Sequence, residues 1–102
     1  MIINSIDIIG TFTYYKENFF NVKITIVPQL RYSVWISGKG LNGAIIEEIY
    51  SDKMEINPGE SKSIKLSILP TDEMKKIKIN DKLYIGSEFH PIGEIIISEI
   101  IA

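Results

Sequence analysis

Few side chains of this chain could do chemistry, and those that could lie near its sole histidine. His90 is followed closely by Glu94 and preceded by Ser87 and Glu88. Two glutamates and a histidine are ligand types for a metal, and serine, glutamate and histidine are the types of a nucleophilic triad. The members of a triad, however, meet through the fold rather than as neighbours in one loop. A loop histidine beside a proline is the commoner case, so we expect no catalytic residue, no metal site and no cofactor.

Other reactive groups lead to the same expectation. Glu47 and Glu48 are adjacent, and neighbours in a strand point to opposite faces, so they cannot work as an acid–base pair. The chain has no cysteine, which excludes disulfides, thiol nucleophiles and cysteine-based metal sites. It also has no Gly-x-x-x-x-Gly-Lys-Ser/Thr phosphate-binding loop. The sequence therefore predicts a protein that is not an enzyme.

The single arginine and the tryptophan indicate binding instead. Tryptophan, tyrosine and arginine are the residue types enriched at binding hot spots. If the apolar residues of segment 30–36 face the core, Arg31 and Trp35 share the opposite, outward face. The alternative is that Trp35 packs under a neighbouring loop, or that this face is covered too.

A second aromatic group surrounds the first expected hairpin. Phe12, Tyr14, Phe19 and Phe20 are candidates for joint exposure there, unless Phe19 or Phe20 fills the barrel end. The predicted interaction surface consists of Arg31, Trp35, Tyr14 and Phe12.

Charge favours a protein partner over a nucleic acid. The formal net charge is −2, and nucleic-acid binders normally carry a basic excess. The lysines between residues 75 and 82 are countered by nearby acidic residues. No apolar run approaches the ~20 residues that span a bilayer, and the N-terminus lacks a secretory pattern. We therefore expect a cytoplasmic protein that makes no use of a membrane.

Turn residues divide the chain into short β-type alternations. The expected turns are a two-residue hairpin turn at Asn42–Gly43, a type II turn at 57–60 and a single helical turn within 70–76, capped by Thr71. The expected strands cover 2–10 with an extension to 15 past a bulge at Gly10, then 22–26, 30–36, 44–50, 54–56, 64–68, 82–86 and 94–101.

About eight strands at this spacing predict an all-β fold: a single closed antiparallel β-barrel of the Greek-key type over residues 1–102. An immunoglobulin-like β-sandwich fits the same count. The last strand has isoleucines on both faces, so it is either central or meets a partner or a second copy of the chain, giving an oligomer. Met1 at the start and a strand running to Ala102 favour a complete small protein.

A series of segments between residues 22 and 101 follows an order known from another barrel. They are 28–32 (Pro-Gln-Leu-Arg-Tyr), 40–45 (Gly-Leu-Asn-Gly-Ala-Ile), 56–60 (Ile-Asn-Pro-Gly-Glu), 77–85 and 92–96 (Ile-Gly-Glu-Ile-Ile). In order and spacing they resemble the C-terminal β-barrel, the third domain, of the elongation factor Tu family. The resemblance implies this fold as a stand-alone domain.

In that family the barrel helps to hold tRNA and a nucleotide-exchange partner, and it works with a GTPase domain. This chain departs from the family at the positions implied in tRNA contact. Residues 16–20 replace the family's Gly-Gly-Arg loop, and His90–Pro91 replace the arginine before its last Val-Gly. The resemblance thus implies the fold more than the ligand.

These observations predict a non-catalytic β-barrel that binds another protein. The concrete case is an immunity protein that neutralises a bacterial toxin. The alternative is an accessory protein that binds RNA or the translation machinery, and a small-ligand or sugar-binding module comes third. Steep salt dependence would mark an RNA binder.

Overall fold

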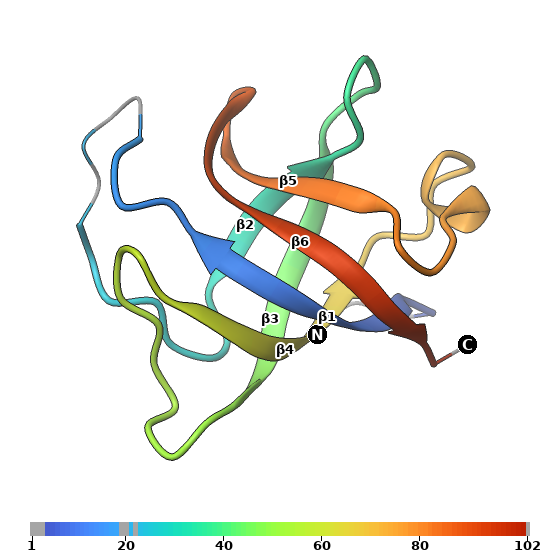
Figure 1. The fold of residues 1–102 in the computed structure, drawn as a ribbon. Coiled ribbons are helices and arrows are strands. Elements are labelled where there is room, and N and C mark those ends of the chain that lie inside the picture. The colour runs from blue at the N-terminus through green and yellow to red at the C-terminus, as the bar shows by residue number, and fades with distance from the viewer. Residues whose placement is uncertain (1–3, 19–20, 22, 102) are drawn as a thin grey trace.

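Strands of the computed structural model close into one antiparallel barrel (Figure 1). The structure describes residues 4–18, 21 and 23–101. Within them it has six strands and one 3-10 turn: β1 Ile6–Tyr14, β2 Arg31–Trp35, β3 Asn42–Tyr50, β4 Ser61–Ile68, η1 Met74–Lys76, β5 Lys82–Ser87 and β6 His90–Ile100. The predicted all-β antiparallel barrel is confirmed, and closure rules out the two-sheet sandwich. No helix in the described ranges is long and apolar enough to cross a membrane.

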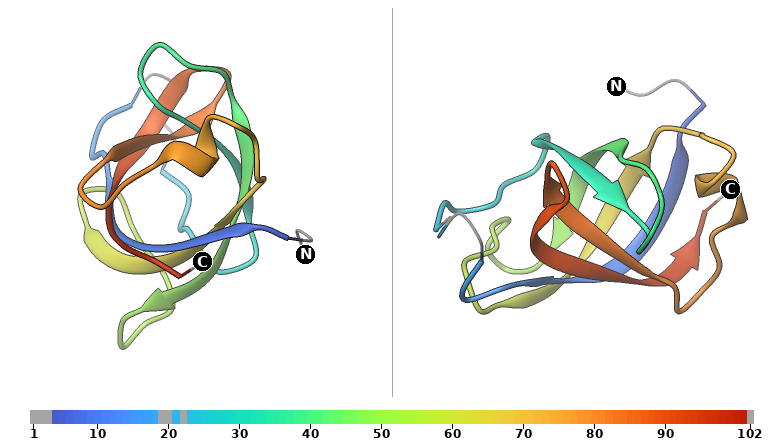
Figure 2. Two further views of the ribbon diagram at one scale, coloured as in Figure 1. Left: turned by 90° about the vertical axis from the view of Figure 1, so that its right-hand side faces the viewer. Right: turned by 90° about the horizontal axis from the view of Figure 1, so that it is seen from above.

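The strand order around the barrel is β1-β4-β3-β2-β5-β6, with β6 returning to β1. Neighbours β2–β3, β3–β4 and β5–β6 follow each other in the chain, but β5 lies beside β2 because residues 69–81 cross the barrel end (Figure 2). Buried Met74 and Ile77 of this crossing pack against the core. Strand β6 pairs with β1 on one edge and with β5 on the other. Of the two expectations for the last strand, a central position or contact with a partner or a second copy, the central position is therefore confirmed.

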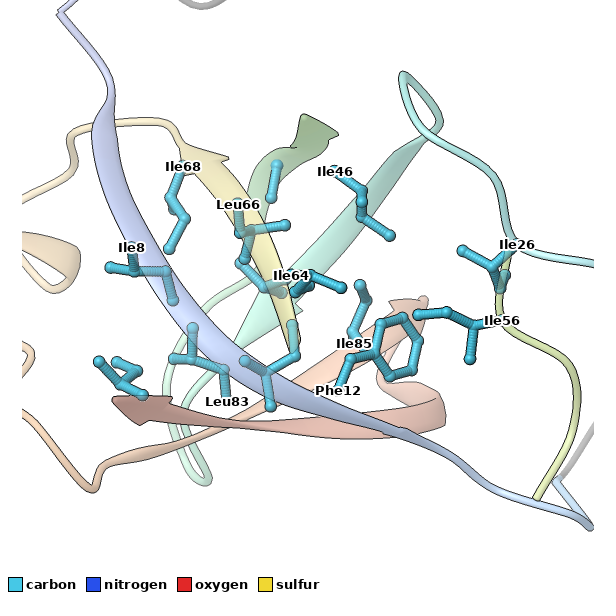
Figure 3. Close-up of a cluster of buried hydrophobic side chains, with 14 of the residues drawn as sticks. Ile8, Phe12, Ile26, Ile46, Ile56, Ile64, Leu66, Ile68, Leu83 and Ile85 are labelled. Carbon is cyan, nitrogen blue, oxygen red and sulfur yellow. The ribbon is translucent and has the colours of Figure 1, made fainter. Parts of the chain in front are cut away.

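Alternation along the strands fills the barrel with isoleucine. On β4, Ile64, Leu66 and Ile68 point inward and are fully buried, as the sequence pattern predicted. β1, β3, β5 and β6 contribute inward residues in the same way, and Figure 3 shows their side chains interdigitating. Stiff β-branched side chains suit this pleated surface, and their burial supplies most of the stabilisation.

Two expected strands are absent as ladders. Val22 lies outside the described residues; residues 23–26 and 54–56 meet at an isolated bridge, in which Ile26 and Ile56 exchange two backbone hydrogen bonds of 2.9 Å. Both side chains are fully buried and lie together at one end of the core (Figure 3), whereas Ile24 is 55% exposed. Each segment therefore delivers one apolar side chain to the barrel end and makes no further ladder, and the expectation of eight strands was too high.

The hairpin turn expected at Asn42–Gly43 is wrong. Both residues lie inside β3, opposite Val34 and Ser33 of β2, and the connection instead runs through 36–41. Asn42 is buried, and its side-chain amide donates to the Gly40 carbonyl at 3.0 Å. The Asn42 amide oxygen also accepts from the Thr71 hydroxyl at 2.7 Å. Asn42 is thus held by specific partners rather than used for its turn propensity.

The other predicted turns are confirmed. Gly59 has a φ of +88° at the third position of the 57–60 turn, and the Glu60 amide donates to the Asn57 carbonyl at 3.0 Å, which is the type II geometry. The single helical turn expected within 70–76 is η1, but its N-cap residue is Glu73 and not Thr71, although the Thr71 hydroxyl accepts from the Met74 amide at 3.3 Å. The bulge expected at Gly10 is present as a register shift between Ile9 and Gly10 against β6.

Barrel closure brings the β6 backbone against β1 at Gly93. A Cβ atom built on Gly93 would overlap the carbonyl oxygen of Thr13 and lie 2.5 Å from Cε1 of Phe12. One of these neighbours is backbone and the other is a buried ring, so neither can move away easily. Only glycine fits at this crossing.

We expect Gly93→Ala to lower the free energy of unfolding by about 1–3 kcal/mol, because the new methyl group overpacks a closed wall. Urea unfolding followed by circular dichroism measures this. Gly40→Ala is the matched control: its nearest atom is 4.0 Å away, on the Glu73 carboxylate, so the change should stay within about 0.5 kcal/mol. Equal effects at the two positions would contradict the closure argument.

Candidate interaction surface

Alternation on β2 separates the core from the outer surface. Val34 is buried in the core, with Tyr32 and Ile36 packed against it, as expected from the pattern. Arg31, Ser33 and Trp35 therefore share the outward face of the strand. The sequence placed Arg31 and Trp35 on this face correctly.

Trp35 is nonetheless covered. Its ring stacks on Tyr84, its cross-strand partner on β5, with centroids 6.0 Å apart and an interplanar angle of 30°. Phe89 meets the same ring edge-on, at 5.6 Å and 72°. Only 5% of Trp35 remains exposed. The alternative in which Trp35 packs under a neighbouring segment is thus confirmed, and the segment is the β5–β6 hairpin.

Phe89 is the aromatic residue that this cluster presents to solvent, with 53% of its surface exposed. Trp35, Tyr84 and Phe89 are here called the aromatic cluster. In it, the packed rings of Trp35 and Tyr84 support the exposed ring of Phe89, which is called the aromatic anchor. Sequence reasoning missed Phe89, because the two residues between Ser87 and His90 contain neither glycine nor asparagine and give no turn signal.

The turn that holds Phe89 is strained. Glu88 and Phe89 both have positive φ, at 49° and 64°, in a two-residue connection between Ser87 and His90, which are paired across the hairpin. This is the arrangement of a type I′ turn, in which asparagine and glycine are preferred. The left-handed conformation costs roughly 1–2 kcal/mol for an ordinary residue. Edge-on packing of Phe89 against Trp35, at about 0.5–1.5 kcal/mol, offsets part of that cost.

Phe12 and Tyr14 do not belong to an exposed group, and this expectation was wrong. Both are fully buried in the barrel, with ring centroids 6.2 Å apart. They share the parity of Ile8 on β1, and the register of β1 with β4 runs on unbroken past Gly10, so the same face stays inward. The Tyr14 hydroxyl donates to the Ile24 carbonyl at 3.0 Å. Phe19 and Phe20 lie outside the described residues.

Arg31 stands between two hollows on the outer face. One, here called the Leu69 hollow, has a volume of about 90 Å³ and is lined by Arg31, Tyr32, Gly43, Ala44, Ile45 and Leu69. The other is broader, about 400 Å³, and is lined by Arg31, Tyr32, Ser33, Gly86 and Ser87. The guanidinium makes no hydrogen bond or ion pair with any part of the chain that the structure describes. It is a solvent-facing cation with all its donors available.

A polar network borders the aromatic cluster. The Glu94 carboxylate accepts from the Tyr15 hydroxyl at 3.1 Å and pairs with the Lys82 ammonium at 3.5 Å. The same ammonium lies 6.0 Å from the centre of the Tyr84 ring. These contacts tie β5, β6 and the end of β1 together beside Trp35. They fix Tyr84, on which the cluster rests.

Two tyrosines on this side of the barrel resist ionisation. Burial raises the pKa of Tyr15 to about 12, with help from the hydrogen bond and the negative charge of Glu94 and from Tyr84. Burial, followed by the proximity of Tyr14, raises the pKa of Tyr32 to about 12 as well. Both phenols are therefore neutral at physiological pH. Tyr32 in particular adds no negative charge beside Arg31.

Metal chemistry finds no support among the described residues, where no group of three or more His, Cys, Asp or Glu side chains is placed to bind an ion. The arrangement that remains consists of one exposed cation, two hollows and a supported aromatic anchor. These groups can bind, because they offer donors, apolar area and shape.

Relief of the turn strain should be measurable. We expect Glu88→Asn to raise the free energy of unfolding by about 0.5–1 kcal/mol, because asparagine tolerates the left-handed conformation. Glu88→Ala removes the same charge without that tolerance, and should give no such gain. Urea unfolding of both variants distinguishes them, and an equal response would show that the turn is not strained at Glu88.

Alkaline pH should unfold the barrel through its tyrosines. A phenol with an ordinary pKa near 10 when unfolded and about 12 when folded stabilises the fold fully below pH 10. That stability is lost as the pH rises from about 10 through 12, since the unfolded chain then releases its proton first. The free energy of unfolding, measured by urea titration at each pH, should fall across this window. Tyr15→Phe and Tyr32→Phe should each make the fall shallower, and an unchanged slope in both would refute the assignment.

Comparison with known proteins does not place the chain in a family. No protein-family model matches the sequence, and no curated protein matches it significantly. The resemblance to the elongation factor Tu barrel therefore stays a prediction from the segments quoted above. The interaction surface is argued from this chain's own geometry.

Proposed function

We propose that this chain is a non-catalytic β-barrel that binds another protein through the outward face of β2 and the β5–β6 hairpin. One observation carries the proposal: Phe89 stands half-exposed on a strained turn, supported by Trp35 and Tyr84, on the same outer face as the unpaired Arg31. Strained backbone that the surrounding structure holds in place is concentrated at functional sites.

The chemistry of this face suits a protein interface. Aromatic residues and arginine dominate hot spots, where a few anchors surrounded by neutral contacts supply most of the affinity. Phe89 is already fixed against Trp35, so binding loses little side-chain entropy. A rigid anchor of this kind favours a tight, lasting complex.

A cytoplasmic immunity protein that neutralises a bacterial toxin is the specific case we favour. Its support is the pre-formed anchor on a small barrel, together with a net charge of −2 that disfavours nucleic acid. We also retain the elongation factor Tu resemblance and the Greek-key arrangement as proposals. The return of β5 to the side of β2, after the consecutive strands β2, β3 and β4, supports the latter.

RNA is the competing ligand, because single strands also use aromatic platforms beside arginine. Its backbone, however, calls for several cations, and the residues lining the two hollows include only one, Arg31. An RNA complex would weaken steeply with salt and disappear after RNase treatment.

The proposal is tested by affinity capture from a lysate of the source organism, with and without RNase, using four versions of the barrel as bait. We expect the native chain to retain one stoichiometric protein, and Phe89→Ser and Arg31→Gln to retain it at least about tenfold less. Tyr50→Ser is the matched control, since Tyr50 is 45% exposed on β3, away from this face.

Capture that is equal for all four baits would place the interface elsewhere, and loss of the captured protein after RNase would favour the translation-related alternative. A captured protein that arrests growth when expressed alone, and not when co-expressed with the barrel, would identify the immunity case. Trp35→Ala is unsuitable here, because removing a covered ring also destabilises the fold.

A further inference from the structure

The Leu69 hollow combines a mostly apolar lining with one charged residue, Arg31. Beside Arg31, its lining consists of Tyr32, Gly43, Ala44, Ile45 and Leu69. Arg31 is the only charged residue in the lining. Ile45 is buried yet lies outside the core cluster, so it forms part of the outer wall rather than of the barrel interior.

Backbone hydrogen bonds and strand register fix the positions of the residues that line the hollow. Leu69 leaves β4 with its amide donating to the Gly43 carbonyl at 2.9 Å, which fixes it above the β3 backbone. The missing side chain of Gly43 leaves the space, because a Cβ atom there would lie 3.1 Å from Cδ1 of Leu69. Arg31 is held opposite Ile45 by the β2–β3 register. Arg31 and Leu69 are thus both positioned by backbone pairing to β3, Arg31 through β2 and Leu69 through the end of β4.

Size and charge define what fits. An apolar cavity of about 150 Å³ accepts a benzene ring, so a hollow of about 90 Å³ suits a branched aliphatic side chain of three or four carbons. The guanidinium at its rim is unpaired and can form two parallel hydrogen bonds to a carboxylate. Because the two groups are adjacent, the aliphatic group and the anion must belong to neighbouring positions of one ligand.

We propose that the Leu69 hollow and Arg31 together bind an aliphatic side chain adjacent to a carboxylate on the partner protein. This inference rests on the proposed function, since it gives the chemistry of the partner segment. The occupant we infer is a C-terminal leucine, isoleucine or valine, because Arg31 lines the same small hollow as the aliphatic residues and such a residue carries its carboxylate beside its own side chain. A phosphate is the poorer match, because no second cation lines the hollow to hold its additional charge.

Small probes test this directly with the full chain. N-acetyl-leucine represents the C-terminal residue, and N-acetyl-aspartyl-leucinamide represents an aspartate next to a leucine within a chain. N-acetyl-leucinamide is the neutral match. We expect N-acetyl-leucine to shift the backbone NMR signals of Gly43, Ala44 and Arg31 progressively at millimolar concentration, with the neutral amide binding about tenfold more weakly. Shifts with N-acetyl-aspartyl-leucinamide alone would overturn the C-terminal assignment.

Two variants make the result specific. Arg31→Gln should reduce the affinity for the acid to that for the amide, whereas Lys39→Gln, which removes an equal charge from the far end of the β2–β3 hairpin, should leave it unchanged. Gly43→Ala should weaken both probes by crowding Leu69. The inference is overturned if no probe shifts these signals, if acid and amide bind equally, or if Arg31→Gln has no effect.

Failure here is distinguishable from failure of the proposed function. Capture of a protein that depends on Phe89 and Arg31, without binding of either acid probe, would retain the interface and reject the hollow as its aliphatic pocket. Binding of a probe without any Phe89-dependent capture would retain the hollow as a binding site and reject the proposed protein interface.

Discussion

The approach of β6 to β1 at Gly93 is the contact on which the rest of the barrel depends. At this point the β6 backbone lies against the Thr13 carbonyl and the Phe12 ring, closer than any side chain would allow. Closure pairs β1 with β4 on one edge and β6 on the other, so the wall has no free edge there. It also encloses Phe12 and Tyr14 within the core, where the first strand supplies its two aromatic rings.

The outward surface follows from the same closure. With β6 fixed on β1, the β5–β6 ladder determines where its hairpin ends, and β5 is fixed in turn against β2. Glu88 and Phe89 are therefore held in left-handed conformations by pairing on both sides of the turn. The resulting strain is local, and Trp35 and Tyr84 receive the exposed ring. A packed barrel thus supports an anchor that an isolated hairpin would not maintain.

Alternation in the sequence predicted what each strand turns inward, but not which segments pair. The sequence correctly predicted β4 from the alternation of Ile64, Leu66 and Ile68, and a type II turn from Pro58–Gly59. Both signals depend on only a few neighbouring residues. The alternation in 22–26 predicted a strand, but among the described residues 23–26 only Ile26 is buried and bridged, while Ile24 is exposed, because alternation alone supplies no ladder partner. The surface was harder to predict. Its hollow joins Arg31, Gly43 and Leu69, which become neighbours only through the β2–β3 register and the exit from β4.

The pairing of the first strand with the last has a consequence for how the chain acquires this structure. Ile8 lies opposite Ile100, so the pairing closes a loop that contains the other four strands. Loop closure of this kind loses entropy before the contact is made, and proteins rich in such contacts fold in milliseconds to seconds rather than microseconds. During synthesis, the edge of β1 that pairs with β6 stays unpaired until β6 has been synthesised. The barrel is therefore a product of late assembly, and its earliest strand is the one most exposed to aggregation on the way.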